Sequence, residues 1–285
     1  FDEFYGALHS NDMAPFKIYR DDQVIEDPVD QTTLTQRYTS EALRFIEQNK
    51  ANPFFLYIPH SFPHVPLFVT EEFEGKSDAG LYGDVVETID WSMGQIFRKL
   101  DELSIDENTM VIFTSDNGPW FEGSSGQFRD RKGTSWEGGL RVPFIARWPS
   151  VISENQRTSY AAMNIDVLPT ILDFAGVKNK SPMDGRSFKE LLSGNTKNAW
   201  REDFLCEHLF EHKKIPKSEG VRSKDWKYIR YFEQDPIYEE FYDLKNDPHE
   251  RDNLSKDANY LEKLNSMRQR CDKLLMDIRK GIKHR

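Results

Sequence analysis

A carboxylate and an amide stand side by side where a short apolar run ends. The run is Val111-Ile112-Phe113, and Asp116 and Asn117 follow it closely. Carboxylate and amide oxygens suit a hard cation such as Ca²⁺, which takes about six to eight oxygen ligands. An Asp-Asn-Gly turn is also common at the end of a strand, so the pair alone leaves a simple turn as the alternative. Two side chains do not complete a calcium site, and other acids must supply the remaining ligands.

A glycine-rich loop with several cations comes next. Lys132 precedes Gly133, and Gly138-Gly139 and Arg141 follow. A lysine ammonium on a flexible stem suits an oxygen of sulfate or phosphate, although a solvated loop lysine is the alternative when Lys132 is taken alone. Glu137 and Arg141 lie four residues apart, which predicts an ion pair that braces a tight turn.

Two histidines lie on a stiff loop. His60 and His64 fall in Pro59–Pro66, where three prolines in eight residues exclude a helix or a central strand. A histidine held rigidly can act as a general acid or donate a hydrogen bond to an anion. The alternative is a histidine that only hydrogen-bonds a backbone carbonyl.

The elements before these loops predict how the residues come together. Phe54–Ile58 and Met110–Thr114 have the character of buried strands, and Tyr82–Leu103 carries an apolar stripe at helical spacing. Strand, helix and strand in this order predict a βαβ unit in a parallel sheet. Ligands bind beyond the carboxyl ends of such strands. We therefore expect His60, His64 and the Asp116-Asn117 pair at one edge of the sheet.

The rest of the chain predicts an α/β fold with a smaller second part. Helices are expected at Thr35–Asn49 and Asp166–Phe174, with Asp166 as N-cap, and short strands at Phe16–Tyr19 and Val142–Trp148. Beyond a polar stretch, an antiparallel meander and a terminal helix are expected at Phe204–Phe210, Trp226–Phe232, Tyr238–Leu244 and Asn259–Lys280. We therefore predict two domains, residues 1–178 and 179–285.

Composition excludes several classes of protein. A formal net charge of −10 over 285 residues argues against sequence-independent binding of nucleic acid, which needs a basic face. No apolar run is long enough to span a membrane. The two cysteines, Cys206 and Cys271, permit one disulfide or none, and neither lies in a setting that activates a thiol. No nucleophile is apparent.

Taken together, the motifs resemble those of the formylglycine-dependent sulfatases, the arylsulfatase branch of the alkaline-phosphatase-like superfamily. The resemblance covers nearly the whole chain, and its motifs come in the family's order. They are Pro53-Phe54-Phe55-Leu56-Tyr57 running into Pro63-His64-Val65-Pro66, then Thr114-Ser115-Asp116-Asn117-Gly118, then Lys132-Gly133, Trp136-Glu137-Gly138-Gly139 and Arg141-Val142-Pro143, then Asp184-Gly185-Arg186-Ser187, Trp226-Lys227-Tyr228 and Tyr242–Pro248.

The resemblance implies a role for each matching residue. Asp116 and Asn117 would be ligands of one Ca²⁺. Lys132 would bind a sulfate oxygen and assist the leaving group, and His64 would contact the sulfate and donate a proton to the departing alcohol. His60, which has no equally firm counterpart, would line the substrate pocket. The fold implied is a mostly parallel sheet flanked by helices, with a small C-terminal antiparallel sheet and a terminal helix.

The chain also departs from the family pattern. The motif C/S-x-P-x-R, which supplies the formylglycine nucleophile, is absent, as are the family's first calcium aspartates. We therefore expect a part of a sulfatase whose nucleophile and remaining calcium ligands come from an N-terminal segment, and which is inactive alone. The resemblance implies a sulfuric ester hydrolase acting on a sulfated small molecule or glycan, in a secreted, periplasmic or lysosomal location, and leaves the oligomeric state open. A phosphate or phosphonate monoester hydrolase and a non-catalytic binder of sulfated glycans are the alternatives.

Overall fold

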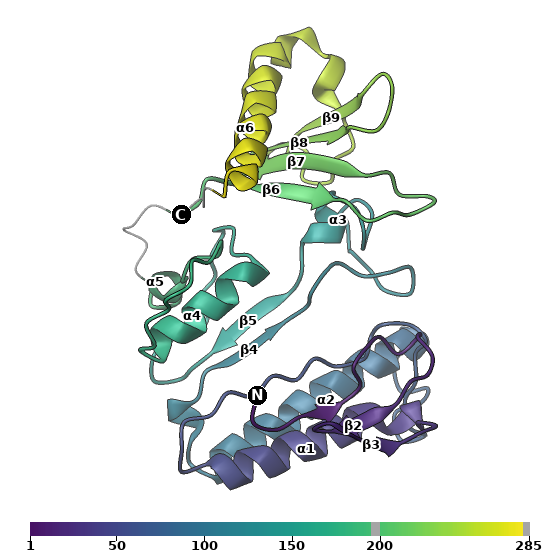
Figure 1. The fold of residues 1–285 in the computed structure, drawn as a ribbon, viewed down its shortest axis with the longest axis vertical. Helices are drawn as coiled ribbons and strands as arrows, with labels where there is room; N and C mark the ends of the chain where they lie inside the picture. Colours follow the sequence, from purple (N-terminus) through teal and green to yellow (C-terminus); the bar gives the residue numbers. More distant parts are fainter. Residues whose placement is uncertain (195–199, 282–285) are drawn as a thin grey trace. The chain divides into compact units, whose positions relative to one another are not determined.

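Residues 1–194 and 200–281 are described by a computed structural model. The chain divides into two units, Phe1–Met110 and Val111–Arg285. The predicted α/β class is confirmed, as are the small C-terminal antiparallel sheet and the terminal helix (Figure 1). The predicted domain boundary near residue 178 stays a prediction.

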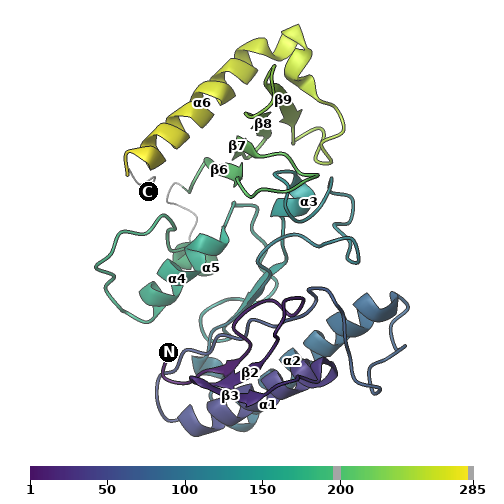
Figure 2. The same cartoon turned by 45° about the vertical axis from the view of Figure 1, so that its right-hand side comes forward.

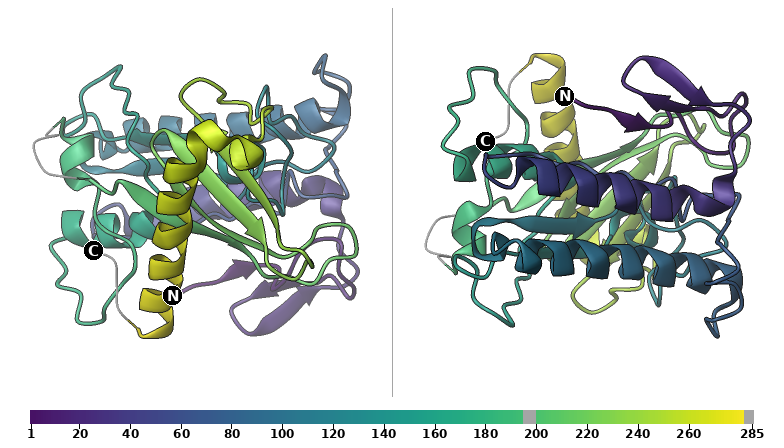
Figure 3. Two further views of the ribbon diagram at one scale, coloured as in Figure 1. Left: turned by 90° about the horizontal axis from the view of Figure 1, so that it is seen from above. Right: turned by 90° about the horizontal axis from the view of Figure 1, so that it is seen from below.

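Two helices form the core of the first unit. α1 (Leu34–Asn49) and α2 (Gly80–Glu102) lie side by side, as the right-hand view of Figure 3 shows. Both were predicted, because each carries an apolar stripe at helical spacing. Thr39 Oγ1 donates a 2.6 Å hydrogen bond to Ser92 Oγ inside the contact. The apolar side chains buried on the two helices are Leu34, Tyr38, Ala42, Ile46, Val85, Ile89, Ile96 and Leu100.

A small antiparallel sheet completes this unit. It consists of β1 (Tyr5–Gly6), β2 (Ile18–Arg20) and β3 (Gln23–Glu26). The sequence predicted one strand here, at Phe16–Tyr19. The β2–β3 hairpin was missed because its turn contains no glycine. Asp21, at φ 53°, takes the left-handed conformation that the turn requires.

The strand expected at Phe54–Ile58 is not formed. Residues 54–58 carry no strand in the described structure and belong to none of the three sheets. Their side chains alternate between partly buried and exposed, with Phe55 51% and Tyr57 64% exposed. The segment therefore has one covered face, whereas the sequence predicted burial on both faces. An apolar run does not reveal whether a partner strand is present.

The second unit begins with a two-stranded sheet. β4 (Val111–Thr114) pairs with β5 (Phe144–Arg147), so the strands expected there are confirmed. The pairing is antiparallel, and all pairings among the described strands are antiparallel. The expected βαβ unit is therefore not formed by the described residues, because it required a strand at residues 54–58. The short helices are α3 (Glu137–Leu140), α4 (Val167–Phe174) and α5 (Lys189–Leu192), with 3₁₀ turns at Gln31–Thr33, Asp106–Asn108, Asn164–Asp166, Leu254–Lys256 and Ala258–Tyr260.

Asp166 precedes α4 as predicted, but its side chain does not cap the helix. The fully buried carboxylate accepts hydrogen bonds from the backbone N–H groups of Met163 (2.8 Å) and Arg186 (2.9 Å). It also forms an ion pair with Arg201. Asp166 therefore joins three separate segments of the chain, a role that its helix-start position did not reveal.

The C-terminal sheet has four antiparallel strands in sequence order. They are β6 (Asp203–His208), β7 (Ser218–Ser223), β8 (Trp226–Tyr231) and β9 (Tyr238–Asp243). Helix α6 (Leu261–Arg279) packs across one face, as Figure 2 shows. Burial of apolar side chains from the sheet and helix stabilises this pair of layers by roughly 1.5–3 kcal/mol for each large side chain. The buried members are Val221, Tyr228, Phe241, Leu264, Met267, Cys271, Leu274 and Leu275.

The sequence missed β7. Its residues, SEGVRS, lack the apolar alternation of a strand. Gly220 is required there, because a Cβ atom would lie 2.2 Å from the carbonyl oxygen of Tyr228. Cys206 and Cys271 are both buried free thiols, so the possibility of no disulfide is the correct one.

Candidate functional site

The end of β4 holds Asp116 and Asn117 in contact. Asn117 Nδ2 donates a 2.5 Å hydrogen bond to Asp116 Oδ2. The side-chain amide of Asn164 donates to the carbonyl oxygens of Ser115 (2.9 Å) and Asp116 (3.2 Å), which holds the backbone of this turn. Asp116 is exposed and forms no ion pair with a basic residue of the described chain. Its carboxylate is therefore accessible to a cation.

The side chains around this pair decide whether the described chain can complete a metal site. Within residues 1–194 and 200–281, no three His, Cys, Asp or Glu side chains gather as a metal site. Asp116 and Asn117 lie side by side and each carries a hard oxygen donor, so the chemistry of this pair fits Ca²⁺. They would contribute only part of the ligand set that this ion requires, as the sequence predicted.

The loop that carries Lys132 packs directly against this strand end. We call residues 129–141 the lysine loop. The backbone N–H of Gly118 donates a 2.9 Å hydrogen bond to the carbonyl oxygen of Gly139, and that of Lys132 donates a 2.9 Å hydrogen bond to Pro119. A Cβ atom on Gly118 would lie 1.9 Å from the carbonyl oxygen of Gly138. The glycines therefore allow a backbone approach that side chains would prevent.

Lys132 is partly buried, and within the described part of the chain its ammonium group forms no ion pair. The next residue, Gly133, has φ +88°, which favours glycine over residues with a side chain. Lys132 is thus a cation without a carboxylate partner among the described residues, on a loop whose backbone is held by hydrogen bonds. Such a group can bind an anionic oxygen.

The predicted ion pair between Glu137 and Arg141 is confirmed, at 2.5 Å between Oε2 and Nε. It belongs to a larger buried cluster. Arg222 Nη2 lies 3.1 Å from Glu137 Oε2, and Lys227 Nζ lies 2.7 Å from Oε1. Burial alone would raise the pKa of Glu137, but Lys227 and Arg222 outweigh it and hold the pKa far below its usual range. Glu137 is therefore a buried carboxylate held in its charged form.

The sequence missed the partners of Glu137 on the C-terminal sheet. Lys227 is fully buried on β8 and also lies 2.8 Å from the buried carboxylate of Glu250. Burial is the main cause that raises the pKa of Glu250. The sequence predicts a strand at Trp226–Phe232, and no local signal marks Lys227 as buried.

Arg129 makes a second connection between the lysine loop and this sheet. Its guanidinium donates to Tyr242 Oη (2.6 Å) and to the carbonyl oxygen of Glu250 (2.9 Å). It also stacks over the ring of Trp136 at 4.1 Å. Trp136 Nε1 in turn donates a 2.6 Å hydrogen bond to Glu240 Oε2. Arg129 and Trp136 therefore anchor the lysine loop to side chains of β9.

The histidines lie in the first unit. His64 Nδ1 is 2.8 Å from the carbonyl oxygen of Val65 and 3.3 Å from Ser10 Oγ. His60 Nδ1 is buried without a hydrogen-bond partner among the described residues. Burial lowers the pKa of His60 to about 4, so its ring is neutral at ordinary pH. The meeting of these histidines with Asp116, Asn117 and Lys132 at one site stays a prediction.

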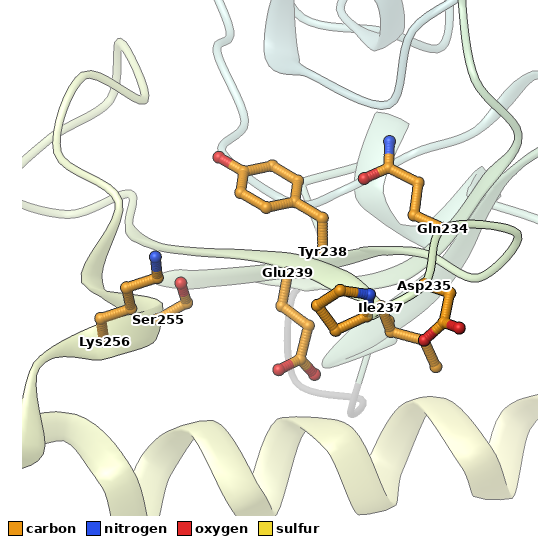
Figure 4. A pocket seen from close by; sticks show the side chains of 8 residues that line it. Gln234, Asp235, Ile237, Tyr238, Glu239, Ser255 and Lys256 are labelled. Atoms are coloured by element: carbon orange, nitrogen blue, oxygen red, sulfur yellow. The ribbon is translucent and has the colours of Figure 1, made fainter.

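A pocket of about 560 Å³ opens elsewhere on the second unit (Figure 4). Tyr238 and Glu239 line it from β9, and Lys256 lines it from a 3₁₀ turn. None of the predicted site residues borders this pocket. The candidate site is therefore the surface at the end of β4 and the lysine loop.

Comparison with known proteins identifies the family of this chain. Residues 1–177 match the family model described as "Sulfatase", and residues 123–277 match the model "N-sulphoglucosamine sulphohydrolase, C-terminal". The chain is 38% identical to human steryl-sulfatase over 211 residues, which cover 70% of this chain and 36% of that protein. It is 39% identical to mouse N-acetylgalactosamine-6-sulfatase over 205 residues, covering 64% of this chain and 39% of that protein.

A solved structure shows the same fold. It is described as a complex with its substrate D-glucosamine-2-N,6-O-disulfate, and it superimposes with a TM-score of 0.80 over 98% of this chain and 77% of that chain, at 21% identity. This chain spans about a third of the length of the curated relatives it matches first. The family model alone covers more than half of the chain. The chain belongs to the sulfatase family.

Proposed function

We propose that the protein containing this chain is a sulfuric ester hydrolase that cleaves a sulfate monoester. One observation carries the proposal. The pair Asp116-Asn117 and the cation Lys132 lie on segments joined by backbone hydrogen bonds, Gly118 N–H to Gly139 and Lys132 N–H to Pro119. The reaction develops negative charge on sulfate oxygens and on the leaving oxygen, and it needs cations held in place to stabilise that charge.

We assign the metal role to Asp116 and Asn117, as two ligands of one Ca²⁺ whose remaining ligands lie outside this chain. When bound, Ca²⁺ would supply positive charge beside the sulfate oxygens. The nucleophile, a formylglycine in the family that the motifs resemble, would also come from outside this chain. The chain's own contribution is then to bind and orient the sulfate group.

We assign Lys132 to a sulfate oxygen and to stabilisation of the leaving group. Its ammonium has no carboxylate partner among the described residues, so it does not have to break an ion pair before it binds an anion. Its backbone N–H is bonded to Pro119, which limits movement of the loop. A positioned cation of this kind contributes about 10²- to 10³-fold to a rate when charge develops beside it.

We assign His64 as the general acid for the departing alcohol. The Val65 carbonyl oxygen, 2.8 Å from Nδ1, can only accept a hydrogen bond. This contact favours the proton on Nδ1 and leaves Nε2 as the nitrogen that takes up and releases a proton. His64 would therefore act as an imidazolium that donates from Nε2.

His60 suits a different role. Since burial lowers its pKa to about 4, its ring stays neutral and cannot serve as an acid near neutral pH. We place it in the lining of the substrate pocket. The substrate proposed is a sulfated small molecule or a sulfated glycan, since the relatives bear the names steryl-sulfatase and N-acetylgalactosamine-6-sulfatase.

We also propose that the protein works outside the cytosol, in a secreted, periplasmic or lysosomal location. This rests on the family resemblance. None of the helices within residues 1–194 and 200–281 is long and apolar enough to cross a bilayer.

The proposed function is tested by turnover of 4-nitrophenyl sulfate and 4-nitrophenyl phosphate by the full-length protein. We expect the sulfate ester to be the better substrate and chain 1–285 alone to be inactive. Preference for the phosphate ester would support a phosphate monoester hydrolase instead. Turnover of the sulfate ester by residues 1–285 alone would refute a nucleophile outside this chain.

A further inference from the structure

Lys227 is a fully buried lysine between two buried glutamates. It lies on β8 of the C-terminal sheet, 2.7 Å from Glu137 Oε1 and 2.8 Å from Glu250 Oε1. The side chains of Lys227 and Glu250 are 0% exposed, and that of Glu137 is 2% exposed. Desolvation of three charged groups is costly unless they compensate one another. This arrangement therefore ties the positions of the three side chains together.

Two of these contacts reach the lysine loop. Glu137 begins α3 within that loop, and its backbone N–H donates a 2.6 Å hydrogen bond to Glu250 Oε2. Glu250 therefore holds the backbone of Glu137 with one oxygen and Lys227 with the other. Lys227 of β8 therefore holds the side chain of Glu137 against the C-terminal sheet, and Glu250, in the segment after β9, holds its backbone.

The backbone carries this constraint to the predicted metal ligands. Gly138 and Gly139 directly follow Glu137. Gly138 N–H donates to the carbonyl oxygen of Arg129 at 2.8 Å, and the carbonyl oxygen of Gly139 accepts from Gly118 at 2.9 Å. Gly118 is the residue after Asn117, so one side of the turn that presents the Asp116-Asn117 pair rests on Gly139.

This backbone contact leaves little room for adjustment. A Cβ atom on Gly138 would lie 2.1 Å from the carbonyl oxygen of Asp130, and one on Gly139 would lie 2.5 Å from that of Thr134. Tightly packed segments transmit displacement, since closely packed interiors are not easily compressed. A shift of Glu137 must therefore move both the turn at Gly118 and the segment that carries Lys132.

We propose that Lys227 is a positioning residue: its buried ammonium group, held by Glu137 and Glu250, sets the lysine loop and the turn at Asn117 in the arrangement that binds the metal and the sulfate. Lys227 is fully buried, and we assign it no direct contact with the metal or the sulfate. The inference rests on the proposed function for the roles of Asn117 and Lys132, while the coupling itself is a property of the fold.

The test compares variants of the full-length protein. Lys227→Met leaves Glu250 without its cation and risks unfolding. Lys227→Met/Glu250→Gln removes both charges, keeps Glu137 paired with Arg222 and Arg141, and retains an acceptor for the Glu137 N–H. The matched control is Arg268→Gln. It removes a different ion pair at the same sheet, between Arg268 of α6 and Glu239 of β9.

Hydrogen exchange measured by mass spectrometry gives a readout that needs neither metal nor turnover. Peptides covering residues 112–141 report the amides of Gly118 and Lys132. In the folded double variant we expect these amides to exchange at least tenfold faster than in the wild type. We also expect the affinity for Ca²⁺ to fall at least tenfold. The value of kcat/KM for 4-nitrophenyl sulfate should likewise fall at least tenfold. Arg268→Gln should stay within twofold of the wild type in all three measurements.

Each outcome decides the proposal. Unchanged exchange in residues 112–141 of the folded double variant would overturn the proposal. Faster exchange would also overturn it if the metal affinity and kcat/KM both stayed within twofold of the wild type. An equal change in the Arg268→Gln control would show general loosening of the sheet and would also overturn it. If the wild type neither binds Ca²⁺ nor cleaves the ester, the proposed function fails, while the exchange data still test the coupling.

Discussion

The backbone N–H of Gly118 donates a 2.9 Å hydrogen bond to the carbonyl oxygen of Gly139. These residues lie on separate segments, one after the predicted calcium pair and the other within the lysine loop. The bond holds the residues proposed to bind the metal and those proposed to bind the anion on one local scaffold. Changes to that scaffold should therefore affect both functions together.

Gly118→Ala should destabilise the second unit and impair activity. The added Cβ would lie 1.9 Å from the carbonyl oxygen of Gly138, so the backbone must shift. Overpacking of this kind typically costs about 1–3 kcal/mol, which urea unfolding would measure as a lower midpoint.

Gly94→Ala is the matched control for this substitution. Gly94 lies within α2, where the nearest atom to an added Cβ is 3.8 Å away. Replacement of a helical glycine by alanine should stabilise the protein by up to about 1 kcal/mol. A Gly118→Ala variant as stable as wild type would show that the glycine contact is not needed.

Asp116→Ala should weaken metal binding by the full-length protein. Loss of a charged oxygen ligand should lower the affinity for Ca²⁺ at least tenfold, as followed by titration calorimetry. Asp184→Ala, a substitution at another loop carboxylate, is the control and should leave the affinity within twofold. Unchanged calcium affinity in Asp116→Ala would remove Asp116 from the ligand set.

The helices were predictable because their apolar stripes are local. Thr35–Asn49 and Tyr82–Leu103 agree with α1 and α2 within about two residues at each end. The prediction of a strand at Phe54–Ile58 was wrong, because the same apolar residues suit any extended segment with one covered face. Strand β7 was missed because its charged side chains are satisfied by distant partners, among them Glu137 and Arg230.

The candidate site, like the fold, was only partly predictable from the sequence. Asp116, Asn117 and Lys132 could be proposed as site residues from the sequence, because an Asp-Asn pair at a strand end and a glycine-rich cationic loop are local patterns. The burial of Lys227 could not be found, since it depends on Glu137 and Glu250, which are 90 and 23 residues away along the chain. Only packing brings those charges together.

His60 should make stability depend on pH. Burial lowers its folded pKa to about 4 from the ordinary 6.5, so the fold favours the neutral ring. The stabilising contribution is complete above pH 6.5 and is lost as pH falls from 6.5 towards 4, because the unfolded chain then binds the extra proton. His60→Gln should reduce the slope of unfolding free energy against pH in that window.

The control for His60→Gln is His212→Gln, which replaces an exposed histidine. It should leave the slope of unfolding free energy against pH unchanged. Unfolding by urea at several pH values between 4 and 7 measures both variants. An unchanged slope in His60→Gln would show that this ring is not buried in the neutral form.

Cys206 and Cys271 should be unreactive in the folded protein. Burial raises the pKa of each thiol to about 12, and both side chains are buried. The thiolate that reacts with iodoacetamide is therefore scarce and shielded. We expect no labelling of these residues under native conditions and full labelling in urea, measured by mass spectrometry. Rapid native labelling of either cysteine would contradict the packing of α6 against the C-terminal sheet.

The most direct test of the proposed function is kcat/KM for 4-nitrophenyl sulfate in the full-length Lys132→Ala variant. The matched control is Lys178→Ala, which removes an exposed lysine of the same unit. Loss of a cation that stabilises developing charge predicts a fall of about 10²- to 10³-fold for Lys132→Ala, with the control within twofold of wild type. Values for both variants within twofold of wild type would contradict the assignment of Lys132 to the sulfate site.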